Sequence, residues 1–377
     1  MSALTVKPFT RLDAIQKKWE LLESPDFPFS DFSYLNALEQ SGSVGPDTGW
    51  SPLYLVAVED GDALGACYLY SKTHSYGEYI FDWSWAQAYE RYQMPYYPKL
   101  LSAVPFTPAT GPKLLFKDGV DKPRVAAALI ASALEQMEAA QHHSLHYLFI
   151  TPDEIPYFEA AGFSIRHSFQ YHWKNEGYTS FEEYLGKLKS KKRKQIERER
   201  QQLGQEGLTF RAVTGEALLP EHAELFYRLY LSTILKMGAI AYLTEDFYRR
   251  VFAAMHDQII LFLAEDRGEV IAGSLCYFKG DALFGRYWGA VRDVRNLHFE
   301  LCYYRPIEWA IAHKLARFEA GAQGEHKHAR GFLPTRTYSA HWIRHPQFRV
   351  AIGNFIDEEK AVLASMFEDM KVHSPFR

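Results

Sequence analysis

A dense group of polar side chains lies between residues 317 and 328. A strand predicted over 317–322 carries Glu319, and amide, acidic, imidazole and ammonium groups follow at Gln323, Glu325, His326, Lys327 and His328. A carboxylate beside apolar residues is costly to bury without a partner, and desolvation raises the pKa of a carboxylate toward the range useful to a general base. We predict that Glu319 and His326 are catalytic, and that Gln323, Glu325 and Lys327 bind substrate. A salt-bridged structural role is the alternative for Glu319.

Two further segments carry polar residues into regular elements. Arg286 alternates with Phe284 and Trp288 in a predicted strand over 283–289, and its guanidinium could bind a carboxylate or phosphate. His298 and Glu300 open a predicted helix over 298–313 on its inward face. We predict that Arg286, His298 and Glu300 bind substrate, with helix capping as the alternative for Glu300.

A basic stretch separates the two halves of the chain. Residues 187–200 contain eight Lys or Arg and two Glu at loosely helical spacing. Such a run is often only a solvated helix face. Closely spaced cations also neutralise phosphates, so we predict that the stretch binds the phosphates of a donor molecule. The predicted contacts are Lys191, Lys192, Arg193 and Lys194.

Other familiar site chemistry has no pattern in this sequence. The compact run from Glu325 to His328 lacks helical i, i+4 pairing and a distant third ligand, so we expect no metal. No GxSxG, Walker or GxGxxG pattern occurs. Direct attack of an amine on a bound ester or thioester needs none of them, because it depends on positioning, a base and a polarised carbonyl.

The composition is that of an ordinary globular chain. Of 377 residues, 47% are hydrophobic and 23% charged, and the net charge of −4 gives no general attraction to nucleic acid or anionic lipid. The three cysteines occur singly in apolar stretches, which favours buried reduced thiols. No signal-peptide pattern and no run of about 18 apolar residues is present, so we expect a cytoplasmic protein.

An internal duplication organises the chain. The Gly-Phe pair at 162–163 is followed by an aromatic residue, a histidine and Trp173, and the pair at 331–332 is followed at the same spacings by an aromatic residue, a histidine and Trp342. Five matches in register indicate two copies of one fold. At this offset Glu319 falls on Ile150, so the polar group is predicted to belong to the second copy alone.

A β-hairpin repeats as well, at a different offset. Strands are predicted over 53–59 and 63–70 around Gly61, and over 259–266 and 270–278 around Gly268. The first copy therefore carries about 38 extra residues, which we assign to the aromatic, proline-rich run 83–112. We predict that this run forms neither a regular helix nor a central strand, and that it lies over a cleft.

Each copy reads helix, β-hairpin, strand, helix, strand, helix, strand, a mixed α/β order. In the first copy we predict helices over 13–22, 33–41 and 122–140 and a strand over 146–150. The expected divisions are 1–175 for the first domain with its insertion, 176–207 for a basic helical connector and 208–377 for the second domain with the active cleft.

This order resembles the GNAT acyltransferase fold, and two tandem units resemble the Fem-type aminoacyl transferases. The segments QYHWKNEGYTSFEEYLGKLKSKKRKQIERER, LHFELCYY and FEAGAQGEHKHARGFLPTRTYSAHWI, with the proline-rich run, resemble blocks of the FemAB-like peptidoglycan biosynthesis/recognition family. The resemblance implies tandem GNAT-like domains that transfer an acyl or aminoacyl group to an amine, with a peptidoglycan precursor as a candidate acceptor.

The donor implied by the resemblance depends on one turn. GNAT enzymes that use acetyl-CoA carry a glycine-containing R/Q-x-x-G-x-G/A turn, whereas the segment here reads AVRDVRNLHF. An aminoacyl-tRNA donor docked on the basic connector is therefore favoured over acyl-CoA. Two alternatives are a non-catalytic module that binds peptidoglycan precursors or nucleic acid, and a CoA-dependent N-acetyltransferase acting on a small molecule.

Overall fold

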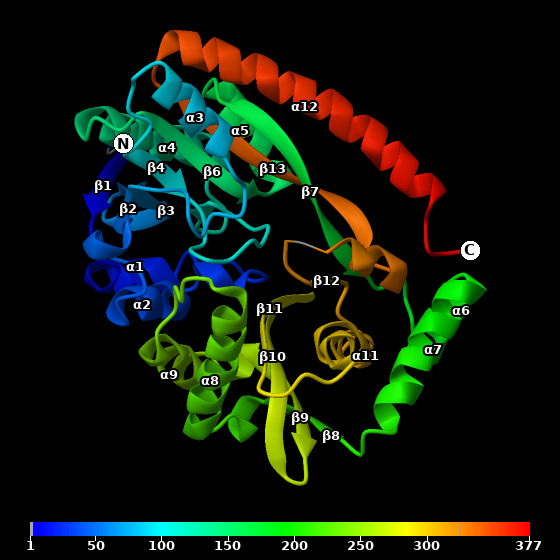
Figure 1. Ribbon diagram of the computed structural model, residues 1–377. Helices are drawn as coiled ribbons and strands as arrows, with labels where there is room; N and C mark the ends of the chain where they lie inside the picture. Colours follow the sequence, from blue (N-terminus) through cyan, green and yellow to red (C-terminus); the bar gives the residue numbers. More distant parts are fainter. Residues whose placement is uncertain (1–2, 323) are drawn as a thin grey trace. The chain divides into compact units, whose positions relative to one another are not determined.

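The computed structural model describes residues 3–322 and 324–377, and it has the expected mixed α/β architecture (Figure 1). The chain forms two compact units, each built from several segments. The first contains the residues up to Ser24, Phe29–Phe169 and Arg336–Phe367. The second contains Pro25–Pro28, Gln170–Thr335 and Glu368–Arg377.

The sheet of the first unit is antiparallel except at one place. Its strands in spatial order are β1 (Thr5–Phe9), β2 (Trp50–Glu59), β3 (Asp62–Lys72), β4 (Lys99–Ser102), β6 (Ser144–Ile150) and β13 (Leu333–Ile343, of which the part from Arg336 belongs to this unit), with β5 (Leu114–Phe116) pairing to β3. Only β4 and β6 in this set run parallel. Its helices are α1 (Gln16–Glu20), α2 (Phe32–Gln40), α3 (Trp83–Arg91), α4 (Lys122–Ala139), α5 (Ile155–Ala160) and most of α12 (Pro346–Val372). The predicted hairpin forms around Gly61, whose φ of +90° suits glycine.

The second unit repeats this plan. Its strands in spatial order are β7 (Ser164–Lys174, of which the part from Gln170 belongs to this unit), β12 (Arg317–Glu319), β11 (Ala282–Ala290), β10 (Glu269–Lys279), β9 (Ile259–Asp266) and β8 (Thr209–Thr214). Here only β11 and β12 run parallel. Its helices are α6 (Phe181–Lys187), α7 (Ser190–Gly204), α8 (Pro220–Met237), α9 (Glu245–Ala254), α10 (Leu297–Phe299) and α11 (Arg305–Ala312). Helix α8 packs so closely on β11 that a Cβ on Gly289 would lie 1.8 Å from the carbonyl oxygen of Leu229.

The duplicated Gly-Phe frame has the same geometry in both copies. Gly162 and Gly331 have φ values of +79° and +82°, and each is followed by a buried phenylalanine. The amide of Phe163 donates to the carbonyl of Phe158 at 3.0 Å, and that of Phe332 donates to the carbonyl of Lys327 at 3.2 Å. Glycine ends a helical turn in each case and an 11-residue strand begins.

The copies exchange their last strands. Strand β7 of the first copy pairs with β12 in the second unit, and β13 of the second copy pairs with β6 in the first unit. The compact units are therefore not continuous in sequence. The divisions 1–175, 176–207 and 208–377 stay a prediction about the sequence copies, with α6 and α7 in the predicted connector.

The strand register corrects the predicted equivalent of Glu319. Glu319 lies opposite His172 in the β12–β7 pair, and His146 lies opposite His341 in the β6–β13 pair. His146, and not Ile150, is thus the counterpart of Glu319. The gapless alignment failed because the segment between the strand and the Gly-Phe turn is four residues longer in the first copy.

The first copy therefore has polar groups of its own, which corrects the prediction that it lacks them. His146 and His341 are buried with their Nδ1 atoms 2.8 Å apart. The ammonium of Lys99 is also buried, and it binds Glu78 at 2.8 Å and the carboxylate of Asp82. Desolvation opposes ionisation of Asp82, but Lys99 and further hydrogen bonds lower its pKa to about 2.

The proline-rich run is more regular than predicted. Residues 83–91 form the nine-residue helix α3, and 99–102 form β4, a central strand of the first unit. Pro95 and Pro98 lie between these elements, so they interrupt neither one. The chain then fills the space beside β6, where the amide of Gly111 donates to the carbonyl of Phe149 at 3.1 Å. This part of the run is core of the first unit.

The ends of several helices and strands differ from prediction, because the local sequence defines where an element ends only to within a few residues. The strand predicted over 317–322 stops at Glu319, and the helix predicted over 13–22 is a 3-10 turn followed by the five-residue α1. The 27-residue α12 was not predicted.

Among the described residues, no helix is both long and apolar enough to cross a membrane.

Candidate functional site

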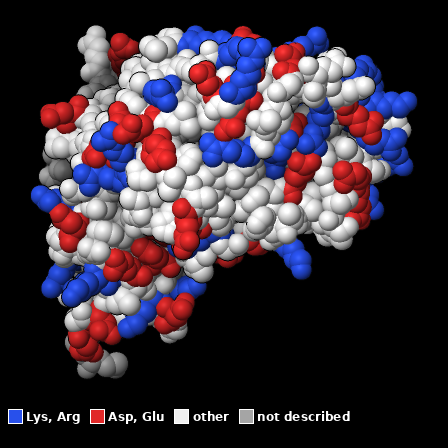
Figure 2. Space-filling model, turned by 90° about the horizontal axis from the view of Figure 1, so that it is seen from below, with Lys and Arg blue, Asp and Glu red and all other residues white. Residues whose placement is uncertain are grey.

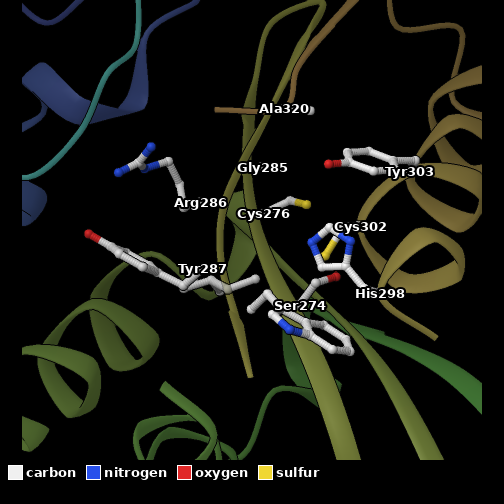
Figure 3. Close-up of a pocket in the computed structure, with 11 residues that line it drawn as sticks. Ser274, Cys276, Gly285, Arg286, Tyr287, His298, Cys302, Tyr303 and Ala320 are labelled. Atoms are coloured by element: carbon white, nitrogen blue, oxygen red, sulfur yellow. The ribbon is translucent and has the colours of Figure 1, made fainter. Parts of the chain in front are cut away.

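A small cavity opens in the second unit where two parallel strands part. Strands β11 and β12 pair only as far as Phe284 and Glu319, after which β12 ends and β11 continues. The cavity has a volume of about 110 Å³ (Figure 3). Its lining residues come from β10, β11, the helix that follows and the residue after β12: Ser274, Leu275, Cys276, Gly285, Arg286, Tyr287, Trp288, His298, Cys302, Tyr303 and Ala320.

A β-bulge sets the direction of Arg286. Leu275 of β10 lies opposite Tyr287, and the next residue, Cys276, lies opposite Gly285, so Arg286 is an extra residue in β11. Figure 3 shows Arg286 and Tyr287 on one side of β11, with Tyr303 and His298 on the other. The prediction that Arg286 and Trp288 share a face is therefore wrong, because the ring of Trp288 packs edge-on against His298.

The helix beside the cavity is widened. Residues Glu300–Tyr304 form a π-helical turn that continues into α11. Pro306 has no amide hydrogen, so it cannot make the hydrogen bond that an α-helix requires one turn earlier. The turn directs Cys302 and Tyr303 to the cavity. Burial raises the pKa of both Cys276 and Cys302, so these thiols stay protonated.

His298 is a neutral imidazole within the cavity wall. Desolvation, followed by the nearby charges of His326, Lys327 and Arg330, lowers its pKa to about 4. Its ring packs edge-on against Trp288 and Tyr303 at centroid distances of 5.2 and 5.5 Å. At neutral pH this ring can accept a proton or donate a hydrogen bond.

Tyr303 connects the cavity to the polar run after β12. Its hydroxyl lies 2.8 Å from Nε2 of His326, and either atom donates according to the tautomer of the ring. Burial raises the pKa of Tyr303 and lowers that of His326, so both groups are neutral near pH 7. A neutral phenol beside an imidazole can donate a hydrogen bond to a developing negative charge.

Lys327 and Arg330 hold this polar run in place. Lys327 is 2% exposed, and its ammonium donates to the carbonyl of Gly321 at 2.9 Å; desolvation lowers its pKa to about 8. The guanidinium of Arg330 donates to the carbonyl of His326 at 2.9 Å and lies 3.5 Å from the ring centroid of Phe299. The backbone of the run is therefore held at Gly321 by Lys327 and at His326 by Arg330.

The comparisons with known proteins decide the family. A model of the FemAB-like family, described as peptidoglycan biosynthesis/recognition, matches residues 11–377. The chain belongs to the FemAB-like family.

Two solved structures show the same fold as this FemAB-like chain. FemX has a TM-score of 0.54 at 12% identity, with 92% of this chain and 100% of FemX covered. L-PGS from Bacillus licheniformis has a TM-score of 0.51 at 10% identity, with 89% and 98% covered. No curated protein matches the chain. At such identities the likeness extends to the fold alone.

The basic helix of this FemAB-like protein is tied to the polar run. Glu199 on α7 binds the guanidinium of Arg330 at 2.8 and 2.9 Å. Arg200 on the same helix makes a two-pronged contact with Glu300 at 2.8 and 3.0 Å, and it also binds Glu308 at 2.6 Å. The predicted phosphate contacts Lys191, Lys192, Arg193 and Lys194 lie on the first turn of α7, outside the cavity lining.

Two predicted site residues lie away from the cavity lining. Glu319 is 4% exposed, and its carboxylate lies 3.4 Å from Nε of Arg317 and 3.8 Å from Nε2 of His172. Strand alternation directs it away from the side of Ala320, which lines the cavity. The carboxylate of Glu300 is bound by Arg200 and Arg305. The contacts of Glu319 correspond to the salt-bridged structural role considered for it, whereas Glu300 forms ion pairs rather than the helix cap considered as its alternative.

The remaining predicted residues divide into two groups. Arg286 and His298 line the cavity, and His326 and Lys327 adjoin it through the contacts described above. Gln323 and the side chain of Glu325 lie outside the described part of the structure. Within residues 3–322 and 324–377, no three His, Cys, Asp or Glu side chains are arranged to hold a metal ion.

Sequence reasoning missed Ser274 and Tyr303. Ser274 lies in an apolar strand, where its hydroxyl donates to the carbonyl of Leu301 at 2.5 Å, and no local pattern marks it. Tyr303 could have been found, because Pro306 three residues later signals an irregular helix. In such a helix the side chains just before the proline can point in directions that a regular α-helix does not allow.

Proposed function

We propose that this FemAB-like protein transfers an acyl or aminoacyl group to an amine at the cavity between β11 and β12. The observation that supports this most is the combination, in one small cavity, of a neutral imidazole, His298, and a phenol, Tyr303, hydrogen-bonded to His326. These groups supply a proton acceptor and a hydrogen-bond donor, the two aids that direct acyl transfer requires.

The proposed reaction begins when the amine nitrogen attacks the carbonyl carbon of an ester or thioester. A C–N bond forms and the carbonyl electron pair moves to oxygen. His298 accepts the proton that the nitrogen loses. The oxygen receives a hydrogen bond from Tyr303 when Nε2–H of His326 donates to the phenol oxygen. The C–O or C–S bond then breaks, and the leaving group departs with the electron pair and takes up the proton.

Glu319 is the second candidate for the base. Its carboxylate and the imidazole of His172 form a buried pair, and Glu319 directly precedes the cavity-lining residue Ala320 in the chain. If Glu319 only positions β12 and β7, Glu319→Gln retains most activity at an unchanged KM. If it is the base, the same variant loses kcat while His298→Gln retains it.

An aminoacyl-tRNA is the donor that we favour. A cavity of about 110 Å³ has room for an acyl group but not for a whole donor. Lys191, Lys192, Arg193 and Lys194 on the first turn of α7 carry the positive charges that would bind phosphates, and Arg193 also lies 3.6 Å from the carboxylate of Glu197. They provide a local basic site, whereas basic and acidic side chains are interspersed over the face drawn in Figure 2. Acyl-CoA is the alternative donor.

The acceptor that we propose is an amine of a peptidoglycan precursor, on the basis of the family description. The test uses the full chain with total aminoacyl-tRNA or with acyl-CoA, and purified peptidoglycan precursors as acceptors. Mass spectrometry is expected to detect an added aminoacyl or acyl group that depends on the protein. No transfer from either donor, together with tight precursor binding, would instead support a non-catalytic recognition protein.

A further inference from the structure

A second, larger cavity lies in the first unit along helix α3. The residues at positions i, i+3, i+4 and i+7 of one helix face, Trp83, Ala86, Gln87 and Glu90, form one wall. The following segment folds back and supplies the other wall with Gln93, Met94, Tyr96 and Tyr97. The groove has a volume of about 560 Å³, within the range of pockets for small molecules or single side chains with their backbone.

The lining of this groove has an unusual charge balance. It contains three aromatic rings and one carboxylate, Glu90, and no Lys or Arg. No ion pair joins Glu90 to another side chain of the described chain, and Glu90 is exposed. Aromatic faces carry partial negative charge, and so does a carboxylate. The groove is therefore suited to a cation.

The aromatic rings of the groove are held in place by contacts with residues outside its lining. The hydroxyl of Tyr96 donates to Asp82 at 2.5 Å, and that of Tyr97 lies 2.8 Å from Oγ of Ser75. The ring of Trp83 stacks on Phe81 at a centroid distance of 6.1 Å. Rings fixed in this way lose little freedom when a ligand binds.

A buried cation already lies against the inner side of two of these rings. The ammonium of Lys99 is 5.5 and 5.7 Å from the ring centroids of Tyr96 and Tyr97. Its charge is balanced by Glu78 at 2.8 Å and by the carboxylate of Asp82. Lys99 therefore adds little net repulsion toward a second cation in the groove.

The groove also offers hydrogen-bond acceptors and apolar contacts. The carboxylate of Glu90 and the amide oxygens of Gln87 and Gln93 match in number the three N–H donors of a primary ammonium. Met94 and Ala86 supply apolar surface for a hydrocarbon stem. A quaternary ammonium could use the rings but would leave these acceptors without a donor.

We propose that the α3 groove binds a ligand with a primary alkylammonium group, of the kind that a lysine side chain presents. The ammonium contacts Glu90 and the two glutamine amides, and the alkyl stem lies along Trp83 and Met94. This site is in the first unit, and the proposal does not depend on acyl transfer at the cavity of the second unit.

Calorimetric titration of the full chain tests this site. The probes are Nα-acetyl-lysine methylamide, its uncharged norleucine analogue, its trimethyl-lysine analogue and a soluble N-acetylglucosamine oligomer. We expect the lysine probe to bind at least roughly fivefold more tightly than the norleucine and trimethyl-lysine probes. Glu90→Gln removes this preference, with the lysine affinity falling about fivefold to tenfold and the norleucine affinity unchanged.

Matched variants separate recognition from folding. Tyr92 lies just beyond α3 and is 74% exposed but does not line the groove, so Tyr92→Ala keeps the lysine affinity. Trp83→Ala weakens all probes that bind, with circular dichroism confirming an intact fold. Equal binding of the lysine and norleucine probes, preferential binding of the saccharide, or no binding of the lysine probe at 10 mM would overturn the proposal.

Discussion

The hydroxyl of Tyr303 lies 2.8 Å from Nε2 of His326, and this contact joins the wall of the cavity to the polar run that follows β12. The two residues are 23 positions apart in the sequence. Tyr303 comes from a π-helical turn and His326 from a 3-10 turn, so the contact depends on two irregular elements. Neither turn alone predicts the contact between Tyr303 and His326; it follows only from the positions of both turns.

The first prediction concerns Tyr303. Tyr303→Phe removes the hydroxyl and keeps the ring, so we expect kcat for acyl transfer to fall roughly 100-fold with little change in KM, as for loss of one hydrogen-bond donor to an oxyanion. Thermal unfolding is expected to change little. Tyr227→Phe in α8 is the control, because Tyr227 does not line the cavity. Equal kcat values for the two variants would remove Tyr303 from the mechanism.

The second prediction concerns acid stability. Desolvation lowers the pKa of His298 to about 4 from the ordinary value of 6.5, so the folded protein binds fewer protons at this site than the unfolded chain does. The resulting stability is complete above pH 6.5 and is lost as pH falls through 4. Between about pH 7 and about pH 5 this accounts for roughly 2 kcal/mol of unfolding free energy.

Urea unfolding at the two pH values measures this contribution. His298→Gln cannot titrate, so its unfolding free energy is expected to fall by roughly 2 kcal/mol less than that of the wild type over the same interval. The same pH dependence in both proteins would show that His298 titrates normally in the folded state. His146, whose pKa burial lowers to about 3, continues to contribute in both proteins.

The third prediction concerns the buried ion pair between Arg330 and Glu199. Arg330 is 3% exposed and bonds Glu199, the hydroxyl of Tyr304 and the carbonyl of His326. Arg330→Met leaves the carboxylate of Glu199 without its cationic partner, with only the hydrogen bonds from Tyr304 and Gln195, so we expect a loss of about 3 to 5 kcal/mol in urea unfolding.

Arg249 provides the matched control for Arg330. It forms an exposed i, i+4 pair with Glu245, and Arg249→Met is expected to cost less than about 1 kcal/mol. Similar losses of unfolding free energy in the two variants would mean that burial does not determine how much the Arg330–Glu199 pair contributes to stability.

The fourth prediction concerns the basic helix. Replacing Lys191, Lys192 and Lys194 together by Gln is expected to weaken tRNA binding and to lower the slope of log affinity against log salt by roughly 2 to 3. The same replacements at Lys7, Lys17 and Lys18 in the first unit remove equal charge. If both triple variants change the slope alike, binding follows net charge and α7 is not a specific docking surface.

The features predicted correctly from the sequence are those with a local cause. The Gly-Phe turns are recognisable from their recurrence in register, and they recur because the left-handed backbone at Gly162 and Gly331 favours glycine and the next residue is buried. The hairpin at Gly61 follows the same reasoning. Such signals recur in both copies, so the tandem fold could be predicted.

The features missed or misplaced depend on contacts between distant segments. His146 replaces Ile150 as the counterpart of Glu319 because the first copy has four more residues between this strand and the Gly-Phe turn, a difference that only the pairing of β12 with β7 and of β6 with β13 reveals. The bulge adds one residue to the otherwise regular strand β11, and it places the side chain of Arg286 on the face opposite to that of Trp288. Arg286 and His298 line the cavity, and their binding of substrate stays a prediction; the wall opposite β11 is completed by Tyr303 rather than by Glu319.

The most direct test of the account is a steric block of the cavity. Ala320 lines it without supplying a reactive group, so Ala320→Leu fills the space where the acyl group would lie. Ala239→Leu, at an exposed position outside the lining, is the control. Single-turnover transfer from aminoacyl-tRNA and from acyl-CoA is measured for the wild type and both variants, with thermal unfolding confirming the fold. We predict that Ala320→Leu lowers the transfer rate at least about 100-fold and that Ala239→Leu does not. Transfer at the wild-type rate by a folded Ala320→Leu protein would contradict the account.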